Sequence, residues 1–221
     1  MTFQRARSEE QREIRRRTIL DTAAAMLDEM PVADVTLNEL SRRVGLAKSN
    51  VLRYFESREA VLFELLERAL ARWLAEVSDE LAAGVEPRLS ARERGDQVAA
   101  VLSASLARQT VLCDLINAQT GVLEHNVSVE AVVRHKRSAV AAIATMSDLI
   151  RRHVPELGDG ARTVSLMTLI LAGALSTYCE PSAGALAAYE VDPTLVELRL
   201  DLRATLESAV ATLIAGTLAR L

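Results

Sequence analysis

The chain has 221 residues, enough for one or two domains with a sizeable hydrophobic core. Hydrophobic residues make up 50% of it and aromatic residues only 3%, and a composition rich in Ala and Leu favours packed helices over strands. The net charge is −4, but residues 1–60 carry a net charge of +1 and the rest of the chain −5. The composition predicts an all-α protein whose N-terminal part is the more suited to attract a polyanion.

The sequence lacks the patterns that are typical of several classes of protein. The two cysteines, Cys113 and Cys179, stand alone, so we expect neither a disulfide framework nor a metal site. Ser-His-Asp, P-loop, GxGxxG and HExxH patterns are missing, so we expect no enzyme and no bound cofactor. Residues 1–17 lack the apolar stretch of a secretory signal, and the most apolar run, residues 164–175, is too short for a membrane span. The expected location is the cytoplasm, without membrane attachment.

Four helices are predicted in the first 82 residues. The first starts at Ser8, in a capping box with Gln11, and ends before Pro31. The other three are expected over about 36–44, 48–54 and 57–82. We place a DNA-binding domain at residues 1–56 and a helical regulatory and dimerisation domain at residues 57–221, with the helix of residues 57–82 bridging the two.

The stretch from residue 35 to residue 62 predicts a helix-turn-helix. Thr36 and Glu39 form a capping box that opens the first short helix, and Gly45 ends it because only Gly adopts a left-handed conformation at low cost. A second short helix after such a turn fits a DNA major groove. Its exposed Asn50 and Arg53 can form bidentate hydrogen bonds with adenine and guanine. The DNA-contacting residues expected from this pattern are Thr36, Arg42, Arg43, Lys48, Ser49, Asn50, Arg53 and Arg58.

The first 60 or so residues resemble the tetracycline-repressor (TetR) family. The matching motifs are Thr36-Leu37-x-Glu39-Leu40, Val44-Gly45-Leu46, Arg53-Tyr54-Phe55 and Ser57-Arg58-Glu59-x-Val61-Leu62. The resemblance implies that Phe55 locks the second short helix to the core and that Tyr54 reaches a phosphate. Ala47 replaces a small serine of the family, Ser49-Asn50-Val51-Leu52 replaces Gly-Thr-Leu-Tyr, and Arg58 replaces Lys. These departures predict a different operator preference rather than a loss of DNA binding. Without the family pattern, a helical subdomain with a solvated Arg/Lys face explains the stretch equally well.

The C-terminal part carries no comparably specific motif. After a boundary at residues 84–95, helices are expected at about 96–118, 128–153, 161–179 and 194–219. The helix of 161–179 is apolar on most sides, so all of its faces must be covered. It and the last helix form either a four-helix interface with a second copy, as the resemblance implies, or a purely internal core. A homodimer would read a palindromic operator.

An effector pocket requires polar groups among apolar helices. The candidates are Cys113, Asn117, Thr120, His135, Thr168 and Tyr178. For each of them, a satisfied core or surface residue is the alternative explanation. The sequence as a whole predicts a dimeric, sequence-specific transcriptional regulator of double-stranded DNA, a repressor released by a small-molecule effector. The alternative is a helical interaction module without sequence-specific DNA binding. Repression and activation are not separable from the sequence.

Overall fold

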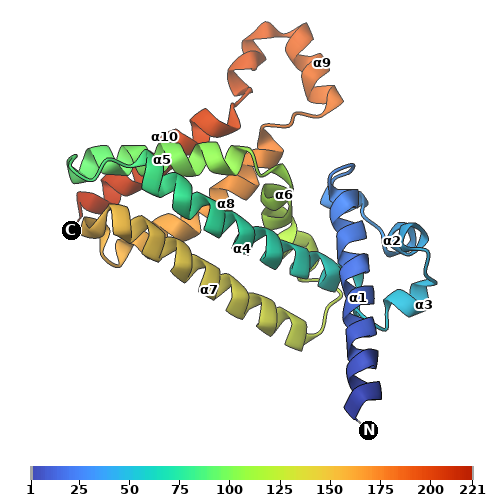
Figure 1. Ribbon diagram of the computed structural model, residues 1–221. Helices are drawn as coiled ribbons and strands as arrows, with labels where there is room; N and C mark the ends of the chain where they lie inside the picture. Colours follow the sequence, from blue (N-terminus) through green and yellow to red (C-terminus); the bar gives the residue numbers. More distant parts are fainter. Residues whose placement is uncertain (1, 221) are drawn as a thin grey trace. The chain divides into compact units, whose positions relative to one another are not determined.

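The computed structural model describes residues 2–220, including the side chains of residues 9–119 and 121–220. Every regular element in this part of the chain is helical, which confirms the predicted all-α fold (Figure 1). Contacts divide the chain into two compact units. Unit 1 contains the residues up to 68 together with 118–137, and unit 2 contains 69–117 and the residues from 138 onward.

Unit 1 contains the predicted helix-turn-helix. Its elements are α1 (Thr2–Leu27), the 3-10 turn η1 (Val32–Asp34), α2 (Leu37–Val44), α3 (Lys48–Val51), the start of α4 (Arg58–Gly84), the π-helical turn η2 (Gln119–Leu123) and the start of α7 (Val129–His153). Apolar side chains from α1 to α4 form its core, because Ile19, Leu20, Leu40, Val51 and Leu62 are almost completely buried. Burial of this kind supplies most of the stability of short helices, which are marginal on their own.

Two predicted helix boundaries in unit 1 are wrong. The first helix begins at Thr2 and not at Ser8, because Gln, Arg and Ala upstream are good helix formers and nothing there stops it. The third helix ends at Val51 and not at Tyr54. Beyond Val51 the chain forms a turn in which the Phe55 amide donates to the Val51 carbonyl, 3.1 Å away. This turn places the Phe55 ring in the core, where only 3% of it is exposed.

Unit 2 is a bundle in which α10 packs against α5 and α8. Besides the later parts of α4 and α7, it contains α5 (Ala91–Ala107), α6 (Thr110–Ala118), η3 (Pro155–Leu157), α8 (Gly160–Tyr178), α9 (Ala183–Val191), η4 (Pro193–Leu198) and α10 (Leu202–Leu218). The packing of α5 on α10 is close, since a Cβ atom on Gly95 would lie 2.6 Å from Ile214 Cγ2. Gly95 therefore belongs to a buried helix face, although the sequence predicted a boundary at residues 84–95.

The region predicted as one helix at 96–118 is two helices. α5 starts earlier than expected, at Ala91, where Ser90 and Glu93 form a capping box. α5 and α6 are bent by 89° relative to each other at residues 108–109. No Gly or Pro stands at this break, so no local signal marks it. The bend lets Leu106 and Leu112 both face the core.

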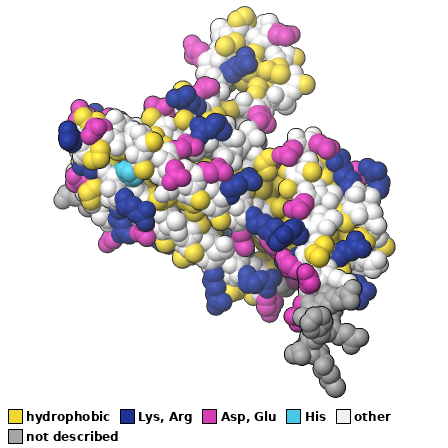
Figure 2. All heavy atoms as spheres, viewed as in Figure 1, with side chains coloured by type: hydrophobic (Ala, Val, Ile, Leu, Met, Phe, Trp, Pro, Cys, Tyr) yellow, Lys and Arg dark blue, Asp and Glu magenta, His cyan; other side chains and the backbone are white. Residues whose placement is uncertain are grey.

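The expected last helix, 194–219, is also divided. Asp192 caps only the 3-10 turn η4, and α10 starts at Leu202 with Asp201 as its N-cap, whose Oδ1 accepts from the Ala204 amide at 2.7 Å. The segment between the expected helices of 161–179 and 194–219 contains a further helix, α9. No residue of α9 or η4 is buried, and the two stand apart from the other helices of unit 2 (Figure 1). Hydrophobic side chains gather on their surface (Figure 2).

α8 is the one described helix that is long and apolar enough, by length and composition alone, to cross a membrane. Core helices of globular bundles share these properties. Val164, Thr168 and Ala172 of α8 are completely buried, and the helix packs against α5 and α10. These contacts account for the apolar residues on one side of α8, whereas Leu166 and Ile170 on its other side are exposed.

Candidate nucleic-acid interface

Hydrogen bonds define both ends of α2, and its C-terminal end forms the turn to α3. Thr36 Oγ1 accepts a hydrogen bond from the Glu39 amide at 3.1 Å, which caps the start of α2. Gly45 ends α2 in the left-handed conformation, with φ at 72°, and the Leu46 amide donates to the Ser41 carbonyl at 3.0 Å. The Thr36 cap and the predicted glycine turn are confirmed, but the predicted capping box is only half formed, because the Glu39 carboxylate binds Arg42 and Arg43 instead of the Thr36 amide. The direction of α3 is therefore fixed from its first residue.

α3 presents polar side chains outward from a single buried anchor. Val51 is completely buried, whereas Lys48, Ser49, Asn50 and Arg53 are exposed. None of these four side chains forms a hydrogen bond or ion pair with another described residue. Leu52, at which the family has Tyr, is 40% exposed and offers no hydrogen-bonding group. The arrangement leaves amide, hydroxyl, ammonium and guanidinium groups available to an external partner.

The arginines of α2 are paired within the protein. Glu39 binds Arg42 at 2.6 Å and Arg43 at 2.9 Å, and Arg43 also binds Glu29 at 2.7 Å. The hydrogen bond from Arg42, followed by that from Arg43, lowers the pKa of Glu39 to about 2. The Arg42 side chain is nevertheless 72% exposed, while that of Arg43 is 25% exposed. Arg42 is thus accessible to a phosphate, and Arg43 is mainly occupied inside the domain.

Arg58 and Tyr54 lie beside other elements of unit 1. Arg58 Nη2 donates to the Val32 carbonyl at 2.9 Å, so this guanidinium ties the start of α4 to η1. Tyr54 is half-buried and borders a groove of about 720 Å³ between α1 and the end of the helix-turn-helix. Arg53 lines the same groove, as do Arg12 and Arg15 of α1.

Arg16 forms contacts that the sequence did not predict. Its Nη1 donates to the Tyr54 carbonyl at 2.9 Å, and its guanidinium carbon lies 4.2 Å from the centre of the Phe55 ring. The same side chain forms an ion pair with Glu64 of α4. A signal existed in the sequence, because residue 16 lies one helical turn before the buried Ile19 and Leu20.

The start of α7 joins the same unit through two contacts. Glu56 Oε1 accepts from the backbone amide of Ser128 at 2.9 Å and from its Oγ at 3.0 Å. Further along α7, the ring of His135 stacks on Phe63 with centroids 4.1 Å apart. Neither ring nitrogen of His135 has a hydrogen-bond partner, and Glu67 Oε1 lies 3.5 Å from Nδ1.

The six candidates for an effector pocket are divided between the two units. Burial, together with the charge of Asp114, raises the pKa of the Cys113 thiol to about 12. Asn117 donates to Thr177 Oγ1 at 2.8 Å, and Thr168 donates to the Val164 carbonyl at 2.8 Å. Tyr178 is 66% exposed. His135 and Thr120 belong to unit 1, and the other four candidates belong to unit 2. The side chain of Thr120 lies outside the described residues.

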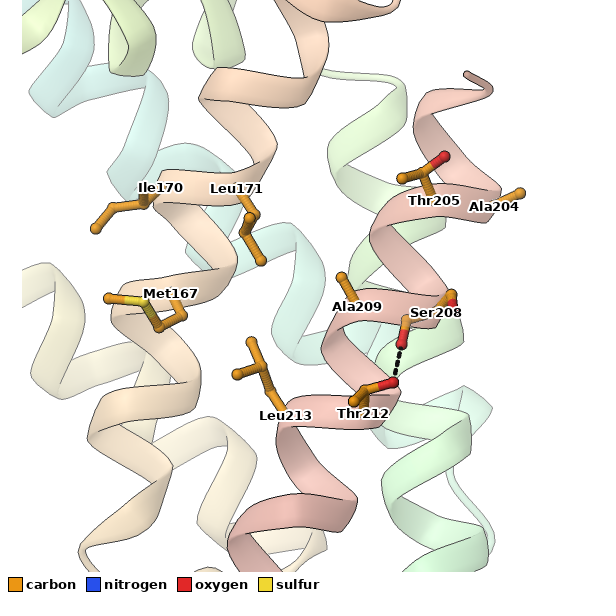
Figure 3. A pocket seen from close by; sticks show the side chains of 9 residues that line it. All are labelled: Met167, Ile170, Leu171, Ala204, Thr205, Ser208, Ala209, Thr212 and Leu213. Atoms are coloured by element: carbon orange, nitrogen blue, oxygen red, sulfur yellow. Dashed lines mark hydrogen bonds between the residues drawn. The ribbon is translucent and has the colours of Figure 1, made fainter. Parts of the chain in front are cut away.

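α8 and α10 share an open apolar face in unit 2. It borders a groove of about 850 Å³ lined by Met167, Ile170 and Leu171 of α8 and by Ala209 and Leu213 of α10. Leu171 points toward α10, whereas Ile170 points away from it (Figure 3). Its polar members, Thr205, Ser208 and Thr212, lie on α10, and Thr212 Oγ1 donates to the Ser208 carbonyl at 2.8 Å. The face therefore has apolar side chains and few free hydrogen-bonding groups.

Metal-binding geometry does not appear among the described residues, where no three His, Cys, Asp or Glu side chains are grouped to hold an ion.

Two family models match the chain. Residues 19–65 match the model of bacterial regulatory proteins of the tetR family, and residues 67–221 match that of the tetracyclin repressor-like C-terminal domain. The chain belongs to the TetR family. It is thus a transcriptional regulator with an N-terminal helix-turn-helix DNA-binding domain, as the sequence motifs predicted.

Curated relatives match a short stretch of the chain. The HTH-type transcriptional regulator EthR of Mycobacterium tuberculosis is 38% identical over 52 residues, which is 24% of this chain and 24% of the relative. The chain is thus aligned with about a quarter of the length of that relative. What EthR does as a whole protein is not carried over by this match.

Solved structures extend the likeness of fold to nearly the whole chain. A TetR transcriptional regulator from Rhodococcus sp. RHA1 aligns with a TM-score of 0.54 and 14% identity, over 93% of this chain and 96% of its own. The regulator FadR from Bacillus subtilis, solved with stearoyl-CoA, aligns with a TM-score of 0.53 and 14% identity, over 90% and 97%. At this identity, the likeness concerns the fold.

Proposed function

We propose that the protein is a homodimeric repressor that recognises a palindromic operator through α3 and is released from it by a small molecule. The observation that carries this proposal is the set of unpaired polar side chains on α3, held by a buried Val51 and a capped turn. Polar groups without internal partners on a rigid helix are what base recognition in the major groove requires.

The proposed contacts divide into base reading and phosphate binding. Asn50 and Arg53 are assigned to adenine and guanine edges, with Ser49 beside them, and Lys48 is assigned to a phosphate. Thr36, Arg42 and Tyr54 are assigned to phosphates. Arg43 and Arg58, which we also keep in the interface, have internal partners and would act chiefly by holding α2 and α4 in place.

The proposed dimer uses the face shared by α8 and α10. An exposed apolar face such as that of Met167, Ile170 and Leu213 is favourable to bury against a second copy. Two copies related by a two-fold axis would form a four-helix interface, and their two α3 helices would read the two halves of a palindrome.

The proposed effector acts on the C-terminal domain. The neighbour FadR was solved with stearoyl-CoA, which supports a ligand-binding role for this fold but does not identify the ligand of this chain. Cys113, Asn117, Thr120, His135, Thr168 and Tyr178 remain the candidate contacts. The effector would shift a population between two arrangements of the recognition helices, which requires different affinities for the two. α4 passes from unit 1 into unit 2 and is the proposed lever. We also propose that the protein acts in the cytoplasm.

The test is selection of duplexes from a random DNA pool at two salt concentrations, with the double variant Asn50→Ala and Arg53→Ala as the control. We expect a palindromic consensus that is weakened by salt and lost in the variant. Equal enrichment by both proteins would assign recognition to other residues. No enrichment by either would favour a helical interaction module that does not select DNA sequences.

A further inference from the structure

We propose that Arg16 is a positioning residue for DNA recognition, which fixes the end of the recognition segment, residues 48–55, on α1 and α4. This inference rests on the proposed role of α3 in reading the operator. Three contacts of one guanidinium support it: the Tyr54 carbonyl at 2.9 Å, the face of the Phe55 ring at 4.2 Å and the carboxylate of Glu64.

The three contacts have different chemistry, and one planar cation satisfies all of them. Its edge donates to a carbonyl and a carboxylate in fixed directions, while its face stacks on an aromatic ring. The Tyr54 carbonyl belongs to the turn that follows α3, so its donor determines where that turn ends. Lysine has a compact ammonium without a plane and cannot reproduce the set.

The neighbouring arginines of α1 show that Arg16 differs from a general basic face. Arg15 and Arg17 are exposed and form no ion pair with any described residue. The side chain of Arg16 is only 34% exposed, and that of its partner Glu64 is 22% exposed. Glu64 is further held by Arg68 at 2.8 Å. The charge of Arg16 is therefore directed into the domain, whereas those of Arg15 and Arg17 face solvent.

The contact of Arg16 with the Tyr54 carbonyl affects DNA binding because the base-reading residues lie close to Tyr54 in the chain. Arg53 immediately precedes the residue whose carbonyl Arg16 holds, and Asn50 lies one helical turn earlier. A loosened end would leave both side chains present but poorly aimed at base edges, and such recognition depends on precise geometry. Attraction to phosphates would persist, because it depends on charge rather than on register.

The experiment compares Arg16→Gln, Arg16→Lys and the matched control Arg15→Gln in the full-length protein. Binding to the selected operator and to a scrambled duplex is measured over a range of salt, and circular dichroism checks folding. For both Arg16 variants we expect operator affinity to fall about tenfold, with affinity for the scrambled duplex and the salt slope close to the wild type. For Arg15→Gln we expect any loss to be equal on both duplexes, with a salt slope reduced by up to about 1.

Two results would overturn the inference. Wild-type operator affinity in Arg16→Lys would show that a positive charge at this position suffices. Equal losses on both duplexes in Arg16→Gln would make Arg16 a phosphate contact like any other arginine of α1. If Arg16→Gln does not fold, Arg16→Lys, which keeps the charge and the aliphatic stem, decides between these outcomes. A wild-type protein that selects no sequence would instead contradict the proposed function.

Discussion

The molecule has two exposed surfaces of opposite character. On α3, hydrogen-bonding groups are left without internal partners, and Val51 beneath them is buried. On α8 and α10, apolar side chains are left without cover, and the polar groups among them are few. The comparison separates two ways of binding. Free polar groups discriminate between partners by hydrogen-bond pattern, whereas an apolar face supplies affinity with less discrimination.

The largest expected effect comes from placing a charge on the apolar face. Ile170→Glu should fold, since Ile170 is already 49% exposed in the single chain. In a dimer the new carboxylates would be buried without partners, which should weaken association at least about 100-fold. Sedimentation velocity measures the shift to monomer, and affinity for a palindrome should fall with it.

Val140→Glu on α7 is the matched control, because Val140 is 52% exposed and does not line this groove. A dimer that survives Ile170→Glu unchanged would remove the proposed interface from α8.

The next largest effect is expected on α3, the surface with free polar groups. Asn50→Ala should lower affinity for the selected operator by about tenfold to a hundredfold, because a bidentate base contact is worth roughly 1–3 kcal/mol. Dimerisation and the salt slope should not change. Lys48→Ala, on the same helix, should instead weaken binding to all sequences and lower the slope by about 1. Fluorescence anisotropy on operator and scrambled duplexes measures both, and identical behaviour of the two variants would contradict the division into base and phosphate contacts.

A smaller effect is expected from releasing the arginines of α2. Glu39→Gln removes the carboxylate that pairs Arg42 and Arg43, so affinity for any duplex should rise severalfold at low salt and the gain should vanish at high salt. The pKa of Glu39 is depressed from 4.5 to about 2, so its pairing is complete above about pH 4.5 and is lost only as pH falls toward 2. The difference between wild type and variant should therefore be constant from pH 6 to 8. A gain that depends on pH in this range would contradict the pairing.

The smallest effect concerns the interior of unit 2. Burial raises the pKa of Cys113 to about 12, so the reactive thiolate is scarce at pH 8 and iodoacetamide should leave Cys113 unmodified in the native protein. Urea should make it reactive, which mass spectrometry of the peptides would show. Rapid native labelling would mean that the region around Cys113 opens, as a ligand cavity there would require.

The helix-turn-helix was predictable because its signals are local. The Thr36 cap, Gly45 and the buried position of Val51 are each set by residues within a few positions of one another. The break between α5 and α6 was not predictable, because it is produced by packing and no breaker residue stands there.

The role of Arg16 was not predictable either. It arises from partners 38 and 48 residues away, and the local signal, its place one helical turn before Ile19 and Leu20, does not identify those partners. The helix of residues 161–179 was correctly predicted as apolar, but whether its open face is covered by a second copy is a question that the Ile170→Glu experiment addresses.

The link between Glu56 and Ser128 bears on how this family can be recombined. The part of the molecule that contains the helix-turn-helix is discontinuous in sequence, since residues 118–137 fold with it. The two family models meet at residues 65–67, within α4. A hybrid regulator joined at that point would keep Glu56 and Phe63 from one parent and receive Ser128 and His135 positions from the other. To transfer operator specificity from one parent to the other, the start of α7 would then have to be transferred as well. The unit to exchange consists of two segments of the chain rather than one.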